Sequence, residues 1–132
     1  GYRNSSIYGM LGYFKLLRND DLDETTKLCE EAYDYNSDDR DIKDNLSICY
    51  FRKGDYEKAE KISDELVVAA PNFVEGFYHG IQIAMKLNEY DKAAEYAEKL
   101  KECKRSGMTT VTEEEVNKLI QEVKNHNENT IG

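Results

Sequence analysis

The chain has 132 residues, of which 39% are hydrophobic and 34% are charged, enough for one domain with a modest apolar core. Its net charge of −9 argues against nucleic-acid binding, because an acidic surface repels the phosphate backbone. No apolar run approaches the ~20 residues that a membrane-spanning helix needs, and the first residues lack a signal-peptide pattern. A single proline and few β-branched runs argue against a β-rich fold.

The first residue and the three cysteines give information about the cellular compartment of the protein. The chain begins with Gly1 rather than methionine, so we expect a leader or anchor upstream. Cys29, Cys49 and Cys103 are an odd number with no close spacing, which predicts neither a metal site nor a disulfide framework. We therefore expect a cytoplasmic protein, or one tethered to a membrane through an upstream segment.

The first predicted unit covers residues 5–39 and contains two helices with a break at Asn19–Asp20. Its apolar residues recur at helical spacing on both sides of that break. They are Tyr8, Leu11 and Gly12 before it, and Leu22, Thr25, Leu28, Cys29 and Ala32 after it.

The second predicted unit, residues 40–73, has the clearest pattern. One apolar stripe consists of Ile42, Leu46, Cys49 and Tyr50, and a second stripe consists of Tyr56, Ala59, Ile62, Ser63, Leu66 and Ala70. Between them, Gly54 favours the left-handed conformation that ends a helix, and Asp55 is expected to cap the next one. Glu60, beside Ala59, is expected to face solvent. Pro71 then ends the second helix.

The third predicted unit, residues 74–106, repeats the second at a distance of 34 residues. The matching pairs are Gly54 and Asn88, Tyr56 and Tyr90, Ala59 and Ala93, Ile62 and Tyr96, and Leu66 and Leu100. A fixed period of this length is typical of a solenoid, in which each unit buries its apolar face only by stacking on its neighbours.

A last helix is predicted over residues 112–125. Thr112 and Glu115 form a capping box, in which the threonine caps the helix and the glutamate bonds back to the cap. Val116, Leu119, Ile120 and Val123 make a narrow apolar stripe, and the opposite face is polar. The pattern predicts a helix that caps the last repeat.

With these three units the chain resembles tetratricopeptide-repeat (TPR) proteins. The segment LSICYFRKGDYEKAEKISDEL, residues 46–66, followed by Ala-Ala-Pro at 69–71, matches the family consensus nearly throughout. The resemblance implies an all-α right-handed solenoid of three helix–turn–helix repeats plus a C-terminal capping helix. More narrowly, YGMLGYFKLL and CKRSGMTTVTEEEV resemble TPR proteins of clostridia-like bacteria.

In the TPR architecture the first helix of each repeat lines a concave groove, and the resemblance therefore implies a peptide-binding site. Phe51, Tyr78 and Met85 are expected to supply apolar contacts. The candidate groove residues are Tyr13, Asn45, Ile48, Phe51, Arg52, Tyr78, His79, Gln82, Met85 and Lys86. The predicted function is a non-catalytic scaffold that binds a peptide segment of another protein there.

Some TPR domains hold the C-terminal carboxylate of heat-shock chaperones with a clamp of lysine, asparagine and arginine. Only Asn45 matches that clamp, whereas its other places hold Gly9, Tyr13, Glu75 and His79. We therefore do not expect a carboxylate clamp. Neither histidine has a serine or cysteine partner at a catalytic spacing, and the sequence has no glycine-rich phosphate loop or metal-ligand cluster. No enzyme activity, cofactor or metal is predicted.

Two further surfaces and one further role stay open as alternatives. Residues 20–44 hold eleven acids and three bases, a local charge of −8, which is either a solvated face or a docking patch for a basic partner. The first repeat has no N-terminal cap, so a weak homo-oligomer stacked through that end is a second alternative. A third is a regulatory domain within a larger membrane-anchored protein.

Overall fold

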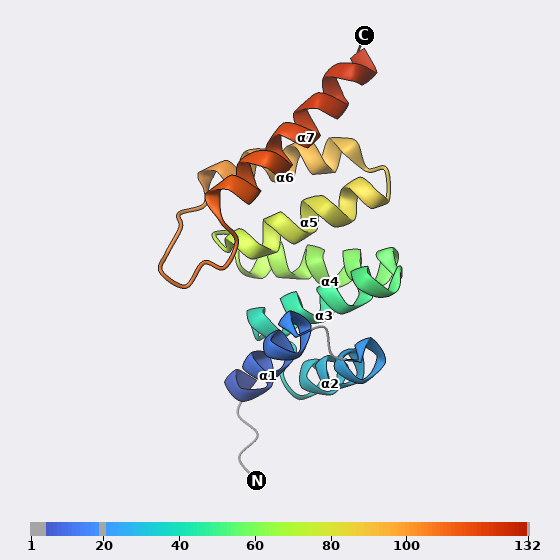
Figure 1. Cartoon of the computed structure of the whole chain (residues 1–132), viewed down its shortest axis with the longest axis vertical. Coiled ribbons are helices and arrows are strands. Elements are labelled where there is room, and N and C mark those ends of the chain that lie inside the picture. The colour runs from blue at the N-terminus through green and yellow to red at the C-terminus, as the bar shows by residue number, and fades with distance from the viewer. Residues whose placement is uncertain (1–4, 19–20, 132) are drawn as a thin grey trace.

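The chain folds into a stack of α-helices, as far as the structure describes it. The computed structural model describes the backbone of residues 5–18 and 21–131, and the side chains of residues 11–18 and 21–128. This part of the chain contains seven helices and no strand. They are α1 (Ser5–Leu17), α2 (Leu22–Tyr35), α3 (Arg40–Lys53), α4 (Tyr56–Ala69), α5 (Val74–Lys86), α6 (Tyr90–Glu102) and α7 (Glu113–Ile131). The stack rises from α1 and α2 to α6 and α7 (Figure 1).

Side chains at the start of α2, α3 and α7 accept hydrogen bonds from free backbone N–H groups, and the capping residues are Asp21, Asp39 and Thr112. Asp39 Oδ1 accepts hydrogen bonds from the N–H groups of Asp41 and Ile42, at 2.9 and 3.0 Å. Thr112 and Glu115 form the predicted capping box: Thr112 Oγ1 accepts from Glu115 N at 3.0 Å, and Glu115 Oε1 accepts from Thr112 N at 3.1 Å. Asp55 stands at the start of α4, but its side chain makes no capping hydrogen bond there, unlike the sequence prediction.

Two turns at the same place in successive units have the same backbone conformation. Gly54 follows α3 with φ of 83°, and Asn88, 34 residues later, follows α5 with φ of 59°. Glycine adopts this left-handed region without strain, and asparagine is among the few other residues that enter it readily. The 34-residue period in the sequence is therefore also a period in the backbone.

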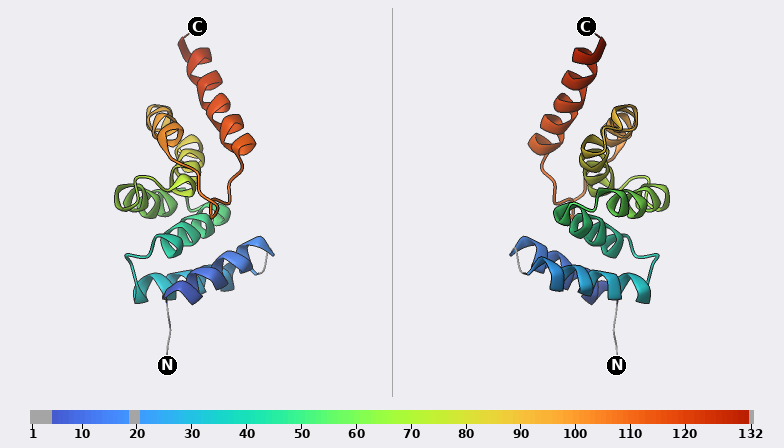
Figure 2. Two further views of the ribbon diagram at one scale, coloured as in Figure 1. Left: turned by 90° about the vertical axis from the view of Figure 1, so that its left-hand side faces the viewer. Right: turned by 90° about the vertical axis from the view of Figure 1, so that its right-hand side faces the viewer.

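The helices form two layers. Each helix of one layer, α1, α3, α5 and α7, contacts the next of that layer, while α2, α4 and α6 pack against them from the other side. In Figure 2, α4 and α6 lie along one side of the stack and α7 along the other. We call α1, α3, α5 and α7 the inner helices. The last helix thus takes the place that the first helix of a further pair would occupy.

Small residues allow the paired helices to approach. Ala59 of α4 and Ala93 of α6 are both 0% exposed, where each helix meets its partner. Leu119 and Val123 of α7 join the core cluster that contains Tyr96, Ala97 and Leu100 of α6, as a capping helix requires.

Packing of α2 against α3 also brings two cysteines together. The Cys49 thiol donates a hydrogen bond to Cys29 Sγ at 3.7 Å, and both cysteines are buried and form no disulfide.

Several sequence expectations differ from the structure or fall outside its described part. The last helix continues to Ile131 instead of ending at residue 125, because the polar tail stays hydrogen-bonded as helix. Glu60 does not simply face solvent, since its Oε2 accepts a hydrogen bond from Lys92 Nζ at 3.1 Å. The break at Asn19–Asp20 and the side chain of Tyr8 lie outside the described residues. The limits of the three repeats stay predictions.

Candidate functional site: the groove on the inner helices

A hollow lies between α3 and α5 on the inner layer. It has a volume of about 130 Å³ and is lined by Ile48, Phe51 and Arg52 together with Ser47, His79 and Ile83. Ser47 and Ile83 are buried and form its floor, whereas Arg52 is exposed at its edge. A half-buried aromatic and an aliphatic side chain beside an exposed guanidinium make an amphipathic recess of side-chain size. Four of the predicted groove residues thus meet in one place.

Phe51 and Arg52 are held by contacts to neighbouring helices. The ring of Phe51 packs on that of Tyr56 from α4, with centroids 5.5 Å apart. Arg52 donates a hydrogen bond from one of its terminal nitrogens to the backbone oxygen of Leu16 at 3.0 Å. That oxygen belongs to the last turn of α1, where carbonyl groups lack helical partners and attract a cation. Arg52 therefore joins the ends of two inner helices and still borders the hollow.

His79 joins α5 to α3. Its Nδ1 lies 2.7 Å from Asp44 Oδ1, and the side chains are 21% and 10% exposed. Burial works to lower the pKa of His79, but the carboxylates of Asp44 and Glu75 outweigh it and raise this pKa above its ordinary value. His79 therefore keeps its proton to a higher pH than an ordinary histidine, and the protonated ring donates to Asp44 and places a positive charge at the wall of the hollow.

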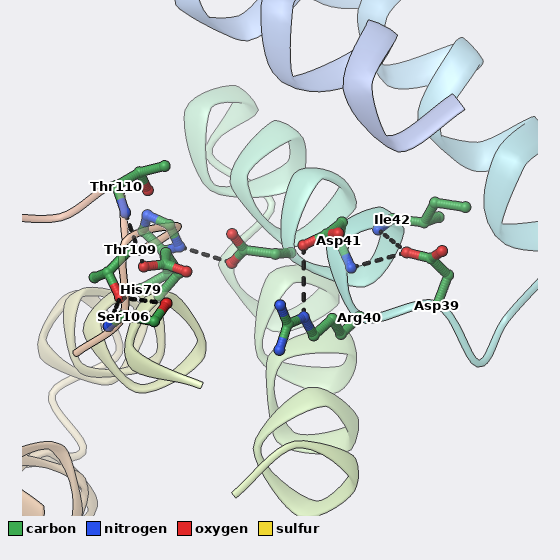
Figure 3. Close-up of polar contacts among 10 residues, drawn as sticks. Asp39, Arg40, Asp41, Ile42, His79, Ser106, Thr109 and Thr110 are labelled. Carbon is green, nitrogen blue, oxygen red and sulfur yellow. Dashed lines mark hydrogen bonds and ion pairs between the residues drawn. The ribbon is translucent and has the colours of Figure 1, made fainter. Parts of the chain in front are cut away.

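The connection between α6 and α7 packs against α5 near His79. Glu75 Oε1 accepts a hydrogen bond from the backbone N–H of Thr110 at 3.2 Å, and Val111 inserts into the core. Figure 3 shows Ser106, Thr109 and Thr110 beside His79, with Asp39 and the first residues of α3, Arg40 to Ile42, on the other side. Burial raises the pKa of Glu75, although the bond from Thr110 acts against that rise.

The same connection is braced by its own hydrogen bonds. Ser106 N donates to Thr109 Oγ1 at 2.9 Å, and the Arg105 guanidinium donates to the backbone oxygen of Val111. Met108, at the tip of this connection, is 83% exposed. An exposed methionine on a braced loop is a flexible apolar contact of the kind that suits recognition.

Tyr78 lies nearer to α7 than to the hollow. It is half-buried and packs against the core cluster that α7 completes. Burial, and then the carboxylates of Glu115 and Glu122 on α7, raise its pKa. Tyr78 therefore helps to seat the last helix, and it is not among the residues that line the hollow at Phe51.

The remaining candidate residues are spread along the groove. Asn45 is only 4% exposed and packs against Gly12 of α1, where a side chain on the glycine would come within 3.1 Å of its amide. Tyr13 is half-buried beside Phe14, with ring centroids 6.0 Å apart. Gln82 and Met85 are half-buried, and Lys86 is exposed. Asn45 thus belongs to a helix interface, while the other four lie at or near the surface.

Sequence reasoning left out three parts of this site. Ser47 and Ile83 line the hollow, and Met108 projects from the connection between α6 and α7. Ile83 follows His79 by four residues, so helical spacing already places both on one face. No sequence pattern signals the position of Met108, because the connection is placed by Val111 and Glu75, which lie 36 residues apart.

Other kinds of site are not found in the described part of the chain. Among the residues whose side chains are described, no three histidine, cysteine or acidic side chains are placed to hold a metal ion. Within residues 5–18 and 21–131, no helix combines the length and apolar character needed to cross a membrane.

Comparison with known proteins identifies the fold. Residues 16–76 match the family model described as a tetratricopeptide repeat. No curated protein matches the chain. The TPR domain of Sgt2 from Aspergillus fumigatus superposes with a TM-score of 0.81 at 17% identity, covering 98% of this chain and 82% of that one.

Two other solved structures have a similar fold. The first TPR domain of Spaghetti (RPAP3), bound to the HSP90 peptide SRMEEVD, has a TM-score of 0.78 at 13% identity, covering 96% of this chain and 94% of that one. The type III secretion translocator chaperone SycD of Yersinia enterocolitica has a TM-score of 0.76 at 13% identity, with 97% of each chain covered. The predicted all-α TPR solenoid fold is confirmed. The resemblance to proteins of clostridia-like bacteria stays a prediction.

Proposed function

We propose that the chain is a non-catalytic interaction module that binds a segment of another protein in its inner groove, with the hollow between α3 and α5 as the main anchor point. The observation that carries this proposal is the meeting of Ile48, Phe51 and Arg52 with His79 around about 130 Å³ of open space. Apolar anchors in such recesses supply most of the energy of peptide recognition, while charged neighbours set orientation.

The segment bound here differs from a chaperone C-terminus. The RPAP3 domain shares the fold and holds an HSP90 peptide. In this chain Glu75 and His79 stand where the clamp has basic residues, and they are engaged with Thr110 and Asp44. We propose instead that an apolar side chain enters the hollow and that an acidic or carbonyl group beside it meets Arg52.

The test uses peptides selected from a random display library on the immobilised chain. Ile48→Arg should fill the hollow with a charged side chain and weaken the selected peptides at least about tenfold, or about 1.4 kcal/mol. Val68→Arg is the matched control, because Val68 is 81% exposed on α4 and should change affinity less than about twofold. Fluorescence anisotropy gives the affinities, and thermal melts verify that both variants fold.

Two results would count against the groove. One is equal affinity of the selected peptides for the wild type and for Ile48→Arg. The other is loss of binding on neutralising Asp34 and Asp38, both exposed, which would make the acidic patch the working surface.

A second candidate function, self-association, is favoured by the surface of α1. Leu11, Phe14 and Leu17 are 41%, 50% and 59% exposed, which leaves apolar side chains uncovered at the first inner helix. Exposed apolar patches often mark interaction sites. The regulatory role within a larger membrane-anchored protein stays a prediction.

A further inference from the structure

Two thiols face each other where α2 meets α3. The Sγ atoms of Cys29 and Cys49 are 3.7 Å apart, and the two residues are 2% and 0% exposed. They belong to one core cluster with Leu16, Leu46 and Ile62. A disulfide bond holds its sulfurs at about 2.05 Å, so these two atoms need to approach by only about 1.7 Å to form one.

The repeat itself does not require two cysteines at this junction. One period of 34 residues later, Ser63 of α4 and Ile83 of α5 take the places of Cys29 and Cys49. They are 1% and 2% exposed, so the next junction buries these places without sulfur. Packing alone therefore does not account for two facing thiols between α2 and α3.

Polar contacts around the pair hold α2 in place. The Tyr50 hydroxyl donates a hydrogen bond to Glu30 Oε2 at 2.8 Å, which joins α3 to α2. The Tyr33 hydroxyl donates to Glu65 Oε2 at 2.9 Å, which joins α2 to α4. These bonds keep the two thiols on facing sides of their helices, so a bond between them needs no change in the packing order.

Cys49 is the thiol of the pair that ionises more readily. The Cys29 thiol can donate to the Cys49 thiolate once it has formed, and this hydrogen bond lowers the pKa of Cys49. Burial acts against this effect, whereas Thr26 and Arg52 add to it. The same pairing raises the pKa of Cys29. Because the thiolate is the reactive form of cysteine, Cys49 is the side chain that reacts first.

The first helix covers the two thiols. The backbone of α1 passes close to Cys29 at Gly12, where an added β-carbon would lie 3.2 Å from Cys29 Sγ. Among the described residues, α1 contacts only α2 and α3, at the lower end of the stack in Figure 1. A terminal helix of a solenoid can open locally while the other units stay folded. Such an opening is a route by which a small oxidant can reach the pair.

We propose that Cys29 and Cys49 are a modification site, at which a peroxide oxidises the two thiols to a disulfide that joins the first helix pair to the second. The Cys49 thiolate attacks a peroxide oxygen and becomes a sulfenic acid, while the O–O bond breaks and the released hydroxide takes up a proton. Cys29 then loses its proton and attacks Cys49 Sγ, so that the S–S bond forms and the hydroxyl group leaves as water. Overall, two thiols lose two electrons and one hydrogen peroxide is reduced to two waters.

The disulfide changes the stability of the domain. It joins residues 20 positions apart and thereby restricts the unfolded chain, while it ties α2 to α3 in the folded one. The oxidised protein is therefore more resistant to unfolding than the reduced one, and a thiol reductant reverses the change. The reaction needs no ligand in the hollow between α3 and α5.

The test treats the full, previously reduced chain with hydrogen peroxide under native conditions. Free thiols are then alkylated and the chain is digested with trypsin in the absence of reductant. Trypsin cleaves after Arg40 and Lys43, so mass spectrometry should find two peptides linked through Cys29 and Cys49. Met108, which is 83% exposed, reports the peroxide dose through its sulfoxide.

Thermal melts measure the effect of the bond. The oxidised wild type should melt at least about 5 °C above the reduced one, and dithiothreitol should remove the difference. Cys29→Ala and Cys49→Ala should each abolish the linked peptides and the rise in melting temperature. Cys103→Ala is the matched control, because Cys103 is half-buried at the end of α6 and should leave both results unchanged. A melt of each reduced variant verifies its fold, and the peptide map of the wild type needs no variant.

Three results would overturn the disulfide site. The first is a chain in which Met108 is oxidised while Cys29 and Cys49 stay thiols or carry oxygen instead of a disulfide. The second is a linked pair of peptides that forms only in urea or that contains Cys103. The third is a disulfide between Cys29 and Cys49 that leaves the melting temperature unchanged, because it would then not join the two helix pairs more firmly.

Discussion

The alanines at positions 59 and 93 stand where the two helices of a pair come closest. Both are fully buried, and both occupy the same place in successive repeats. A side chain larger than a methyl group at such a place forces the helices apart or the neighbours out of their preferred rotamers. These positions therefore decide how tightly each unit closes.

Ala59→Phe and Ala93→Phe should each lower the free energy of unfolding by about 1–3 kcal/mol or more, as measured by urea denaturation. Lys61→Ala is the control, because Lys61 is exposed on the same helix as Ala59 and should change stability by less than about 0.5 kcal/mol. Glu60 is unsuitable for that purpose because it binds Lys92. If Ala59→Phe and Lys61→Ala lower the free energy of unfolding equally, the assignment of buried and exposed positions within the repeat is wrong.

His79 makes stability depend on pH at the junction of the second and third units. Asp44, Glu75, Arg52 and, on α7, Glu115 are the charged groups that face it. The two carboxylates Asp44 and Glu75 raise the folded-state pKa, so the folded protein holds the proton more tightly than the unfolded chain. This contribution is complete below the ordinary histidine pKa of about 6.5 and is lost as pH rises through the higher folded value.

We therefore expect the free energy of unfolding to fall as pH rises from about 6.5 through the higher folded-state pKa of His79, and to fall less in His79→Gln. NMR titration of the His79 ring proton should give a pKa above the ordinary value. Asp44→Asn should lower this pKa, because it removes the nearest carboxylate. If the free energy of unfolding changes with pH in the same way in the wild type and in His79→Gln, then the contact between His79 and Asp44 at 2.7 Å does not couple stability to pH.

At the scale of an element, α7 decides how the solenoid ends. Its buried side chains Leu119 and Val123, with Val111 just before it, belong to the same cluster as Tyr96 and Leu100 of α6. The last repeat would otherwise expose that flank. The helix covers one side of α6, and a hollow of about 300 Å³ stays open between the two helices.

Deleting residues 112–132 should lower the melting temperature and promote aggregation, because the apolar flank of α6 becomes solvent-exposed. Light scattering during a thermal melt measures both effects. Gln121→Ala, an exposed change on the same helix, should alter neither. A truncated chain that stays monomeric with the same melting point would show that α7 is not a cap.

At the scale of the whole molecule, the two ends of the stack differ. The C-terminal end is covered in part by α7, whereas α1 presents Leu11, Phe14 and Leu17 to solvent. Among the described residues, each helix contacts only helices that lie one or two places away in chain order, so the ends are where another chain can extend the array without rearrangement.

If the N-terminal end self-associates, the weight-average mass in sedimentation equilibrium should rise with concentration. Leu11→Glu combined with Phe14→Glu should abolish that rise, since charges at both positions make the contact unfavourable. Val68→Glu is the matched control on the outer face of α4 and should leave the association intact. A mass that stays monomeric at all concentrations would remove this candidate function.

The sequence by itself determined the helices, their pairing and the repeat. Apolar spacing identified the stripes around Ala59 and Ala93, and Gly54, Pro71 and the Thr112–Glu115 box marked helix ends, because these signals depend on local conformation. The resemblance to TPR proteins, added to this pattern, implied that Ile48, Phe51, Arg52 and His79 face one groove, and these four residues line one hollow.

Only the tertiary structure decided what depends on distances between residues far apart in the chain. It buried Asn45 against α1, paired Glu60 with Lys92, and joined Asp44 to His79 across 35 positions. It also folded the connection at Thr110 onto Glu75 and left a hollow between α6 and α7. A one-dimensional pattern records which face a side chain is on, but not which neighbour meets it, because that depends on how the helices cross.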